Sequence, residues 1–279
     1  MGKFDGALIF SDIDGTYLGS DRCPGKGNVE AIRYFQSEGG LFTFATGRMV
    51  VNTMFAVPNI EELANFPVVL NNGTSLYDYR TQTRSYSSFM EPEIVKALME
   101  YVTEYFPHIG IRVSVPEGFV YPYEHPMILR DMSRVRHVAR MLPFEAWDIT
   151  QIYKVVFRGT SEELAVMQAA LNERFADLLT IVLSEVEILE TQKKGVSKGS
   201  MINMLRRQFA EKGEPMRIFC IGDYENDLEM LRAADFAACP SNAIDSVKEI
   251  AQIHLCSCDD GAVADLISYI ESHPELLRS

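Results

Sequence analysis

The chain has few cysteines and no long apolar run, and its cysteines do not have the spacing of a metal site. Its five cysteines among 279 residues are scattered and include no CxxC pair, which argues against a disulfide framework or a cysteine-ligated zinc site. No apolar run approaches the ~18 residues of a membrane span, and the apolar stretch near the N-terminus is too short for a signal peptide. We therefore expect a cytoplasmic protein with no membrane partner.

Basic residues are also fewer than acidic residues. The chain holds 39 Asp and Glu against 26 Lys and Arg, which gives a formal net charge of −13. This balance argues against a nucleic-acid partner, because proteins that bind nucleic acids present a basic surface to the phosphates. A hydrophobic fraction of 47% and a charged fraction of 23% are ordinary for a folded enzyme. Nothing in the sequence indicates the oligomeric state.

Apolar and amphipathic segments alternate at both ends of the chain. Apolar runs at residues 7–11, 41–45 and 67–70 are separated by helix-like stretches, and a similar alternation follows residue 195. Strands that are apolar throughout, alternating with helices, are typical of a parallel sheet with helices on both faces. We predict an α/β fold whose core is a doubly wound, Rossmann-like parallel sheet.

The middle of the chain follows another pattern. Residues 111–115 alternate apolar and polar side chains, as antiparallel strands with one exposed face do. Helices are expected here at residues 91–106, 130–142 and 161–175. We therefore predict an α+β domain inserted into the α/β domain, with the core in residues 1–86 and 188–279 and the inserted cap in residues 87–187.

Ligands of an open parallel sheet bind at the carboxyl ends of its strands, and four such ends carry polar or acidic residues. They are Asp12-Ile-Asp14-Gly15-Thr16, Thr46-Gly47-Arg48, Asn71-Asn72-Gly73 and Gly222-Asp223-Tyr224-Glu225-Asn226-Asp227. Each segment alone can be a turn, and Asp223 and Asp227 can also be acids that favour a helix N-terminus. Neither interpretation explains why acids follow two different strands.

The fold would bring up to four carboxylates to one edge of the sheet, those of Asp12, Asp14, Asp223 and Asp227. Their mutual repulsion is unfavourable, and a divalent cation would relieve it. Oxygen ligands suit a hard cation, and Mg2+ takes few carboxylates together with water and phosphate oxygens. We therefore predict a Mg2+ site with these four residues as candidate ligands.

Lys198 opens a helix in the sequence GVSKG, directly after Ser197 as the expected N-cap. A cation at this end opposes the helix dipole, and Gly199 adds the ~1 kcal/mol cost of a helical glycine relative to Ala. A bound phosphoryl dianion would offset both effects, because the lysine and the helix N-terminus would act on the same anion. Thr46 and Gly47 can face an anion too. The alternatives are a solvated surface lysine and an ordinary tight turn.

Together these segments resemble the motifs of the haloacid dehalogenase superfamily of phosphotransferases. DIDGT is similar to its first motif, DxDGT, TGR supplies the second-motif threonine, Lys198 the third motif, and GDYEND the fourth, GDxxND. The motifs follow in order over nearly the whole chain. The insertion between the second motif and the lysine resembles the larger, type IIB cap of the Cof-type sugar-phosphatase branch. That branch commonly has NGA where this chain has NNG followed by Thr74.

The resemblance implies a Mg2+-dependent phosphatase that acts on a small phosphorylated metabolite through an aspartyl-phosphate. Asp12 would be the nucleophile and Asp14 the general acid and base. Asp12, the Asp14 backbone carbonyl and Asp223 would hold Mg2+, and Asp227 would bind it through water or orient Lys198. The residues expected to hold the phosphoryl group or the substrate are Thr46, Gly47, Arg48, Lys198 and Asn226, of which Thr46 and Lys198 also belong to the catalytic set. The cap would determine specificity.

Two other functions stay open. A phosphomutase of the phosphomannomutase type is similar to this chain in having DxDGT and a related cap. A non-catalytic metabolite-binding protein would have no need for a general acid at Asp14. Transport ATPases of the superfamily have Thr at that position, which leaves their aspartyl-phosphate long-lived.

Overall fold

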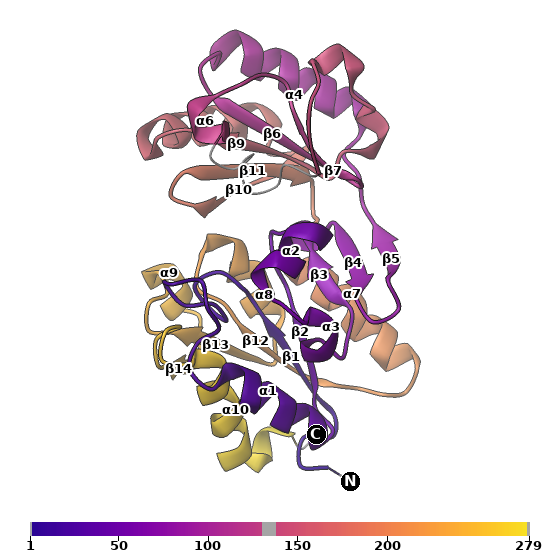
Figure 1. The fold of residues 1–279 in the computed structure, drawn as a ribbon, viewed down its shortest axis with the longest axis vertical. Helices are drawn as coiled ribbons and strands as arrows, with labels where there is room; N and C mark the ends of the chain where they lie inside the picture. Colours follow the sequence, from indigo (N-terminus) through magenta and orange to yellow (C-terminus); the bar gives the residue numbers. More distant parts are fainter. Residues whose placement is uncertain (1, 130–137, 278–279) are drawn as a thin grey trace. The chain divides into compact units, whose positions relative to one another are not determined.

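The computed structural model describes residues 2–129 and 138–277, which form two compact units (Figure 1). Unit 1 comprises Met1–Tyr86 and Ser197–Ser279, and unit 2 comprises Ser87–Val196. The inserted segment was expected to end at residue 187, but strand β11 (Ile188–Lys193) pairs with strand β9 (Lys154–Arg158). Because β11 is held in that sheet by its backbone hydrogen bonds, unit 2 continues to Val196. No helix in the described ranges is long and apolar enough to cross a membrane.

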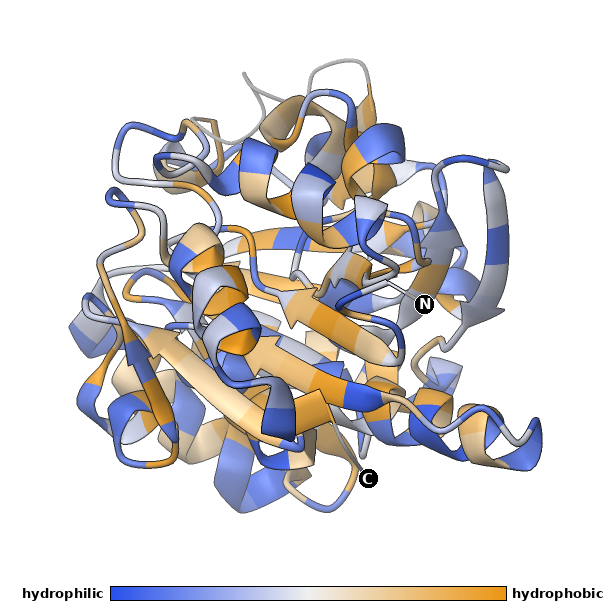
Figure 2. Ribbon diagram, turned by 90° about the horizontal axis from the view of Figure 1, so that it is seen from below, coloured by the Kyte–Doolittle hydropathy of each residue, from blue (hydrophilic) through white to orange (hydrophobic). Residues whose placement is uncertain are grey.

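A five-stranded parallel sheet forms the centre of unit 1, in the order β14-β13-β12-β1-β2. Its strands are β1 (Ala7–Ser11), β2 (Leu41–Phe44), β12 (Arg217–Ile221), β13 (Phe236–Pro240) and β14 (Ile253–Leu255). Every residue of β1 is buried, since β1 lies between two other strands and under helices. Figure 2 shows the apolar character of these strands. The predicted doubly wound α/β class is confirmed.

Helices cover both faces of this sheet because successive side chains of β1 point to opposite faces. Ala7 and Ile9 pack in one apolar cluster with α1 and α10, whereas Leu8 and Phe10 pack in another with α7 and α8. The helices of unit 1 are α1 (Asn28–Ser37), α2 (Val50–Ala56), α3 (Ile60–Leu63), α7 (Lys198–Glu211), α8 (Leu228–Ala233), α9 (Asp245–Lys248) and α10 (Ala262–Ser272). The helix and strand alternation expected at the two ends of the chain is therefore present.

A smaller sheet, in the order β3-β4-β5, follows β2 in the chain. It consists of β3 (Val68–Leu70), β4 (Ser75–Asp78) and β5 (Thr83–Ser87). A single bridge joins Ala45 to Val69, and the amide of Thr46 donates a 2.9 Å hydrogen bond to the carbonyl oxygen of Val69. The 3-10 turn Asn71–Gly73 is thereby placed beside the end of β2.

Unit 2 is a six-stranded sheet in the order β10-β11-β9-β6-β7-β8 with helices packed on one face. The strands not yet bounded are β6 (Gly110–Val115), β7 (Gly118–Tyr121), β8 (Ala139–Met141) and β10 (Leu179–Glu185). Helices α4 (Pro92–Tyr105) and α6 (Ser161–Phe175) occupy two of the three expected positions. The third expected helix, at residues 130–142, lies largely outside the described residues. Its described end is wrong as a helix, because Ala139–Met141 pairs with β7 as a parallel strand.

Candidate active site

The acidic strand ends of unit 1 meet because β1 runs parallel to β12 in register. The amide of Asp12 donates a 2.9 Å hydrogen bond to the carbonyl oxygen of Ile221, which extends the pairing one residue beyond β1. Asp223 follows β12 directly after Gly222. One carboxylate oxygen each of Asp12, Asp223 and Asp227 lie within 4.8 Å of one another. This cluster of three carboxylates is the centre of the candidate site.

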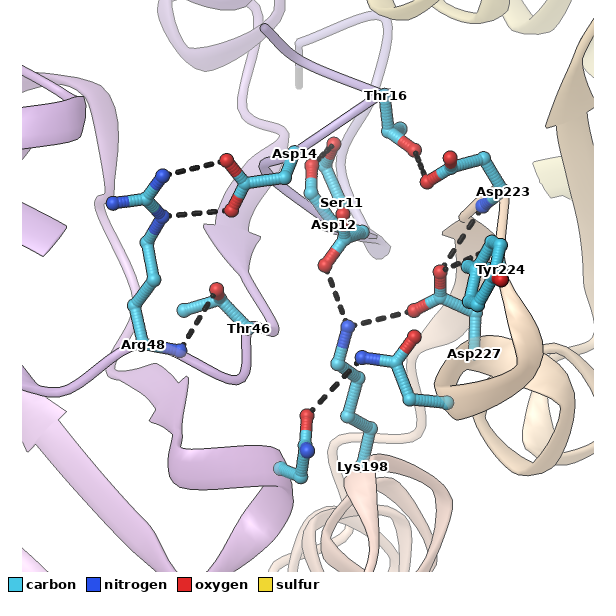
Figure 3. Close-up of polar contacts among 12 residues, drawn as sticks. Ser11, Asp12, Asp14, Thr16, Thr46, Arg48, Lys198, Asp223, Tyr224 and Asp227 are labelled. Carbon is cyan, nitrogen blue, oxygen red and sulfur yellow. Dashed lines mark hydrogen bonds and ion pairs between the residues drawn. The ribbon is translucent and has the colours of Figure 1, made fainter. Parts of the chain in front are cut away.

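Lys198 is buried between two of these acids (Figure 3). Its Nζ atom donates hydrogen bonds of 2.6 Å to Asp12 Oδ1 and 2.7 Å to Asp227 Oδ1. Ser197 is the N-cap of α7, since its hydroxyl oxygen accepts a 3.0 Å hydrogen bond from the amide of Ser200. The Lys198 side chain has 0% of its surface exposed, which excludes the solvated-lysine alternative. Two carboxylates therefore balance a cation at the unfavourable end of this helix.

Gly199 has a structural reason to be glycine in the first turn of α7. A Cβ atom there would overlap the backbone carbonyl of Glu229 in α8. Because α7 approaches α8 so closely, even the methyl group of an alanine would require the two helices to shift. The helical glycine, which the sequence alone connects only with an anion site, is explained by packing.

Asp227 uses both of its carboxylate oxygens within the site. Oδ2 accepts hydrogen bonds from the amides of Asp223 at 3.0 Å and Tyr224 at 3.2 Å, while Oδ1 faces Lys198. These bonds close the loop between β12 and the 3-10 turn Glu225–Asp227. Two roles were expected for Asp227, binding of Mg2+ through water and orientation of Lys198, and the contact with Lys198 is the one present here.

Asp223 is held from the other side by the loop after β1. Thr16 Oγ1 donates a 2.9 Å hydrogen bond to Asp223 Oδ1. Gly15 has a positive φ of 77°, and a Cβ atom there would overlap the Asp223 carboxylate. Asn242 Nδ2 donates a 2.8 Å hydrogen bond to the carbonyl oxygen of Gly15 and so fixes this loop. Sequence reasoning assigned no role to Thr16, although it lies within DIDGT, and Asn242 carried no motif that marks it.

Burial and repulsion raise the pKa values of two of the clustered acids. Burial, followed by the neighbouring Asp227 and Asp223 charges, raises the pKa of Asp12 well above its usual range, although Lys198 opposes the shift. Burial and Asp227 raise the pKa of Asp223 to about 7. Burial disfavours the charged form of Lys198, but the carboxylates of Asp12 and Asp227 outweigh it and raise the pKa of this lysine. At Asp12 and Asp223, burial and the neighbouring carboxylates thus outweigh the opposing effect of the Lys198 charge.

The Asp14 side chain is directed away from the cluster, toward Arg48 (Figure 3). Arg48 donates two parallel hydrogen bonds, from Nε to Oδ2 at 2.7 Å and from Nη2 to Oδ1 at 2.5 Å. The expectation of four gathered carboxylates is therefore corrected to three. The physical reason is that the planar guanidinium fork binds both oxygens of one carboxylate.

Thr46 and the Asn71–Gly73 turn border the cluster. The amide of Asn72 donates a 3.0 Å hydrogen bond to the carbonyl oxygen of Thr46. Asn226 Nδ2 donates a 3.3 Å hydrogen bond to Asn72 Oδ1, which links this turn to the loop after β12. The Thr46 hydroxyl oxygen accepts a 3.2 Å hydrogen bond from the amide of Arg48. The four polar strand ends thus meet, and Asn72, which the sequence marks only as part of a possible turn, connects two of them.

Comparisons with known proteins agree with this arrangement. Residues 9–267 match the family model described as haloacid dehalogenase-like hydrolase. The chain is 27% identical over 280 residues to the HMP-PP phosphatase of Serratia proteamaculans, with 98% of each chain covered. A HAD/COF-like hydrolase from Plasmodium vivax superposes with a TM-score of 0.83 at 22% identity, covering 97% of this chain and 96% of that one. A sugar phosphatase of HAD subclass IIB superposes with a TM-score of 0.79 at 20% identity, covering 95% and 98%. These two structures share its fold.

Proposed function

The chain belongs to the haloacid dehalogenase-like hydrolases, and from this membership and the site geometry we propose that it is a Mg2+-dependent phosphatase acting through an aspartyl-phosphate on Asp12. The observation that carries the proposal is a fully buried lysine shared by Asp12 and Asp227 inside a cluster of three carboxylates. A buried ion pair of this kind is weak evidence for stability, since apolar residues would serve stability as well. Binding of a negatively charged phosphoryl group would explain why the lysine and the carboxylates are buried together.

The donor set fits Mg2+. All of its candidate ligands are oxygens, and Mg2+ is bound in proteins by one or two carboxylates with water and phosphate oxygens. Burial raises the pKa values of Asp12 and Asp223, so a dication beside them would favour their ionised forms. Asp12, Asp223 and the Asp14 carbonyl would hold the ion, with Asp227 linked to it through water. When bound, Mg2+ would neutralise negative charge that develops on the phosphoryl group.

Asp12 would form a bond from its carboxylate oxygen to phosphorus while the bond to the leaving oxygen breaks. Lys198 favours the ionised form of Asp12 and would contact the phosphoryl oxygens, together with Thr46, Gly47 and Asn226. Asp14 would give its proton to the leaving oxygen. It would then accept a proton from the water that attacks the aspartyl-phosphate, which releases phosphate and restores Asp12.

The substrate would be a small phosphorylated metabolite, and unit 2 would determine which one. Residues of unit 2 contain none of the four motif segments, so they are free to differ according to the leaving group. Two of the similar proteins are named an HMP-PP phosphatase and a sugar phosphatase. Both names are compatible with a small phosphate compound as the substrate here.

The proposal is tested by phosphate release from p-nitrophenyl phosphate and from a panel of phosphorylated metabolites, with Mg2+ and with a chelator. We expect release with Mg2+ and little release with the chelator. Equal rates in both conditions would contradict the metal dependence. Transfer of radiolabelled phosphate to a second position of the substrate, without free phosphate, would instead identify a phosphomutase.

A further inference from the structure

The pair formed by Arg48 and Asp14 is a strong polar contact of the site to which the proposed reaction gives no use. The two hydrogen bonds of 2.7 and 2.5 Å occupy both oxygens of the Asp14 carboxylate. A third guanidinium nitrogen, Nη1, donates a 3.2 Å hydrogen bond to the carbonyl oxygen of Asn52 in α2. Arg48 is thus anchored to the chain on one side and holds Asp14 on the other.

The backbone around Asp14 is also fixed. The amide of Leu18 donates a 2.8 Å hydrogen bond to the carbonyl oxygen of Ile13, and a backbone bridge joins Asp14 to Leu18. The Asp14 side chain, in contrast, has 47% of its surface exposed. Its carboxylate can therefore change position by side-chain rotation alone, and a half-exposed aspartate without a partner would populate several rotamers.

We propose that Arg48 acts on the reaction through Asp14, as a positioning residue that fixes the direction of the Asp14 carboxylate. The proposal rests on the proposed phosphatase function. A carboxylate that exchanges a proton with the leaving oxygen needs one of its oxygens, so one bond of the fork must open while the other keeps Asp14 aligned. Lys198 and Thr46 remain to bind the phosphoryl group. This role departs from the phosphate-binding role that the sequence suggested for Arg48.

Substrates with different leaving groups distinguish a positioning role of Arg48 from a phosphate-binding role. An alkyl phosphate has a poor leaving group that depends on a general acid, whereas the nitrophenolate of p-nitrophenyl phosphate departs without one. The ratio kcat/KM covers the steps up to departure of the leaving group, so it reports this difference even when a later step limits kcat. A group that only binds phosphoryl oxygens would affect both esters alike.

The experiment measures kcat/KM on p-nitrophenyl phosphate and on an alkyl phosphate that the wild type cleaves. The proteins are the wild type, Arg48→Gln, Arg48→Lys, Asp14→Asn and the double variant Arg48→Gln/Asp14→Asn. General acid catalysis contributes about 10²- to 10⁴-fold, so we expect Arg48→Gln to lose about tenfold or more on the alkyl ester and about twofold or less on the aryl ester. Arg48→Lys should not restore the alkyl rate, because an ammonium group does not form the planar fork. In the Asp14→Asn background, Arg48→Gln should add no further loss.

The proposal would be overturned if Arg48→Gln lowered kcat/KM equally on both esters, or if its loss added to that of Asp14→Asn. Arg48 would then be a phosphate ligand. Arg33→Gln is the matched control, since Arg33 forms an exposed ion pair with Glu62 in the same unit. Absence of phosphate release by the wild type would instead contradict the proposed function. The inference rests on that function and would then fail with it, whereas the comparison of the two esters tests the inference alone.

Discussion

Lys198 Nζ lies 2.6 Å from Asp12 Oδ1, although 186 positions separate the two residues in the chain. The contact exists because β1 and β12 pair in parallel, which brings the segments after both strands to one edge of the sheet, and because α7 begins at that edge. Both side chains are buried. The pair therefore combines a large electrostatic interaction with a large desolvation cost.

Lys198→Met should destabilise the metal-free protein. Removal of one partner from a buried ion pair costs about 3–5 kcal/mol, because the remaining charges stay buried without compensation. The helix dipole alone predicts the opposite sign, a gain of a few tenths of a kcal/mol or more for removing a cation from this helix end. Chemical unfolding without metal decides between the two. Lys3→Met is the control, since its ion pair with Glu271 is exposed and should contribute little to stability.

The metal-free protein should lose stability as the pH rises from about 5 to about 7. Burial and Asp227 raise the pKa of Asp223 to about 7, so in this range the folded state binds more protons than the unfolded state. The stability that protonation of Asp223 confers is fully present below the pKa that Asp223 has in the unfolded chain. It is lost as the pH rises through the pKa that Asp223 has in the folded protein. Burial shifts the pKa of Asp12 in the same direction. Melting temperatures across this range should fall for the wild type and fall less for Asp223→Asn. A rise with pH would contradict the raised pKa values.

Gly199→Ala should destabilise the protein although alanine is the better helix former. Helix propensity predicts a gain of about 1 kcal/mol. The added methyl group would overlap the backbone of Glu229, and overpacking of this kind typically costs about 1–3 kcal/mol. Urea unfolding of the variant gives the sign directly. A stabilised variant would contradict the close packing of α7 against α8.

Replacement of residues 87–196 by a short Gly/Ser linker should leave a core that still cleaves small aryl phosphates weakly. The motif residues lie in unit 1, whereas the proposed specificity lies in unit 2. Activity on the natural metabolite should fall far more than activity on the aryl ester, with circular dichroism to verify that the core is folded. Equal losses on both substrates in a folded core would mean that unit 2 supplies catalytic groups.

The sequence predicted those parts of the site that follow from strand order. Asp12, Thr46 and Asp223 each come directly after or soon after a buried strand, and parallel strands end at one edge, so their proximity could be inferred. Ser197 was predictable as the N-cap because its hydroxyl and its position before Lys198 are local features. The sequence could not show whether Asp227 binds the metal or orients Lys198. The answer depends on which of its carboxylate oxygens faces Lys198 and which faces the backbone amides.

Features set by distant side chains were not predictable. The sequence places Asp14 beside Asp12, but the direction of its carboxylate depends on Arg48, which lies 34 positions away. The role of Asn242 depends on a contact with Gly15 across 227 positions. The boundary of unit 2 was misplaced for a similar reason, since pairing with β9 assigns Ile188–Lys193 to unit 2.

Covalent labelling of Asp12 tests the proposed mechanism at its first step. Wild type and Asp12→Asn are mixed with radiolabelled substrate and Mg2+, quenched with acid during turnover, and the protein-bound label is located by peptide mass spectrometry. Asp177→Asn, which alters an exposed aspartate of unit 2, serves as the control. We expect phosphoryl label on Asp12 in the wild type and in the control. In Asp12→Asn we expect no label and less than about a tenth of the wild-type rate, which corresponds to a barrier increase above about 1.4 kcal/mol. Substantial turnover by Asp12→Asn, or label on another residue, would contradict the proposed mechanism.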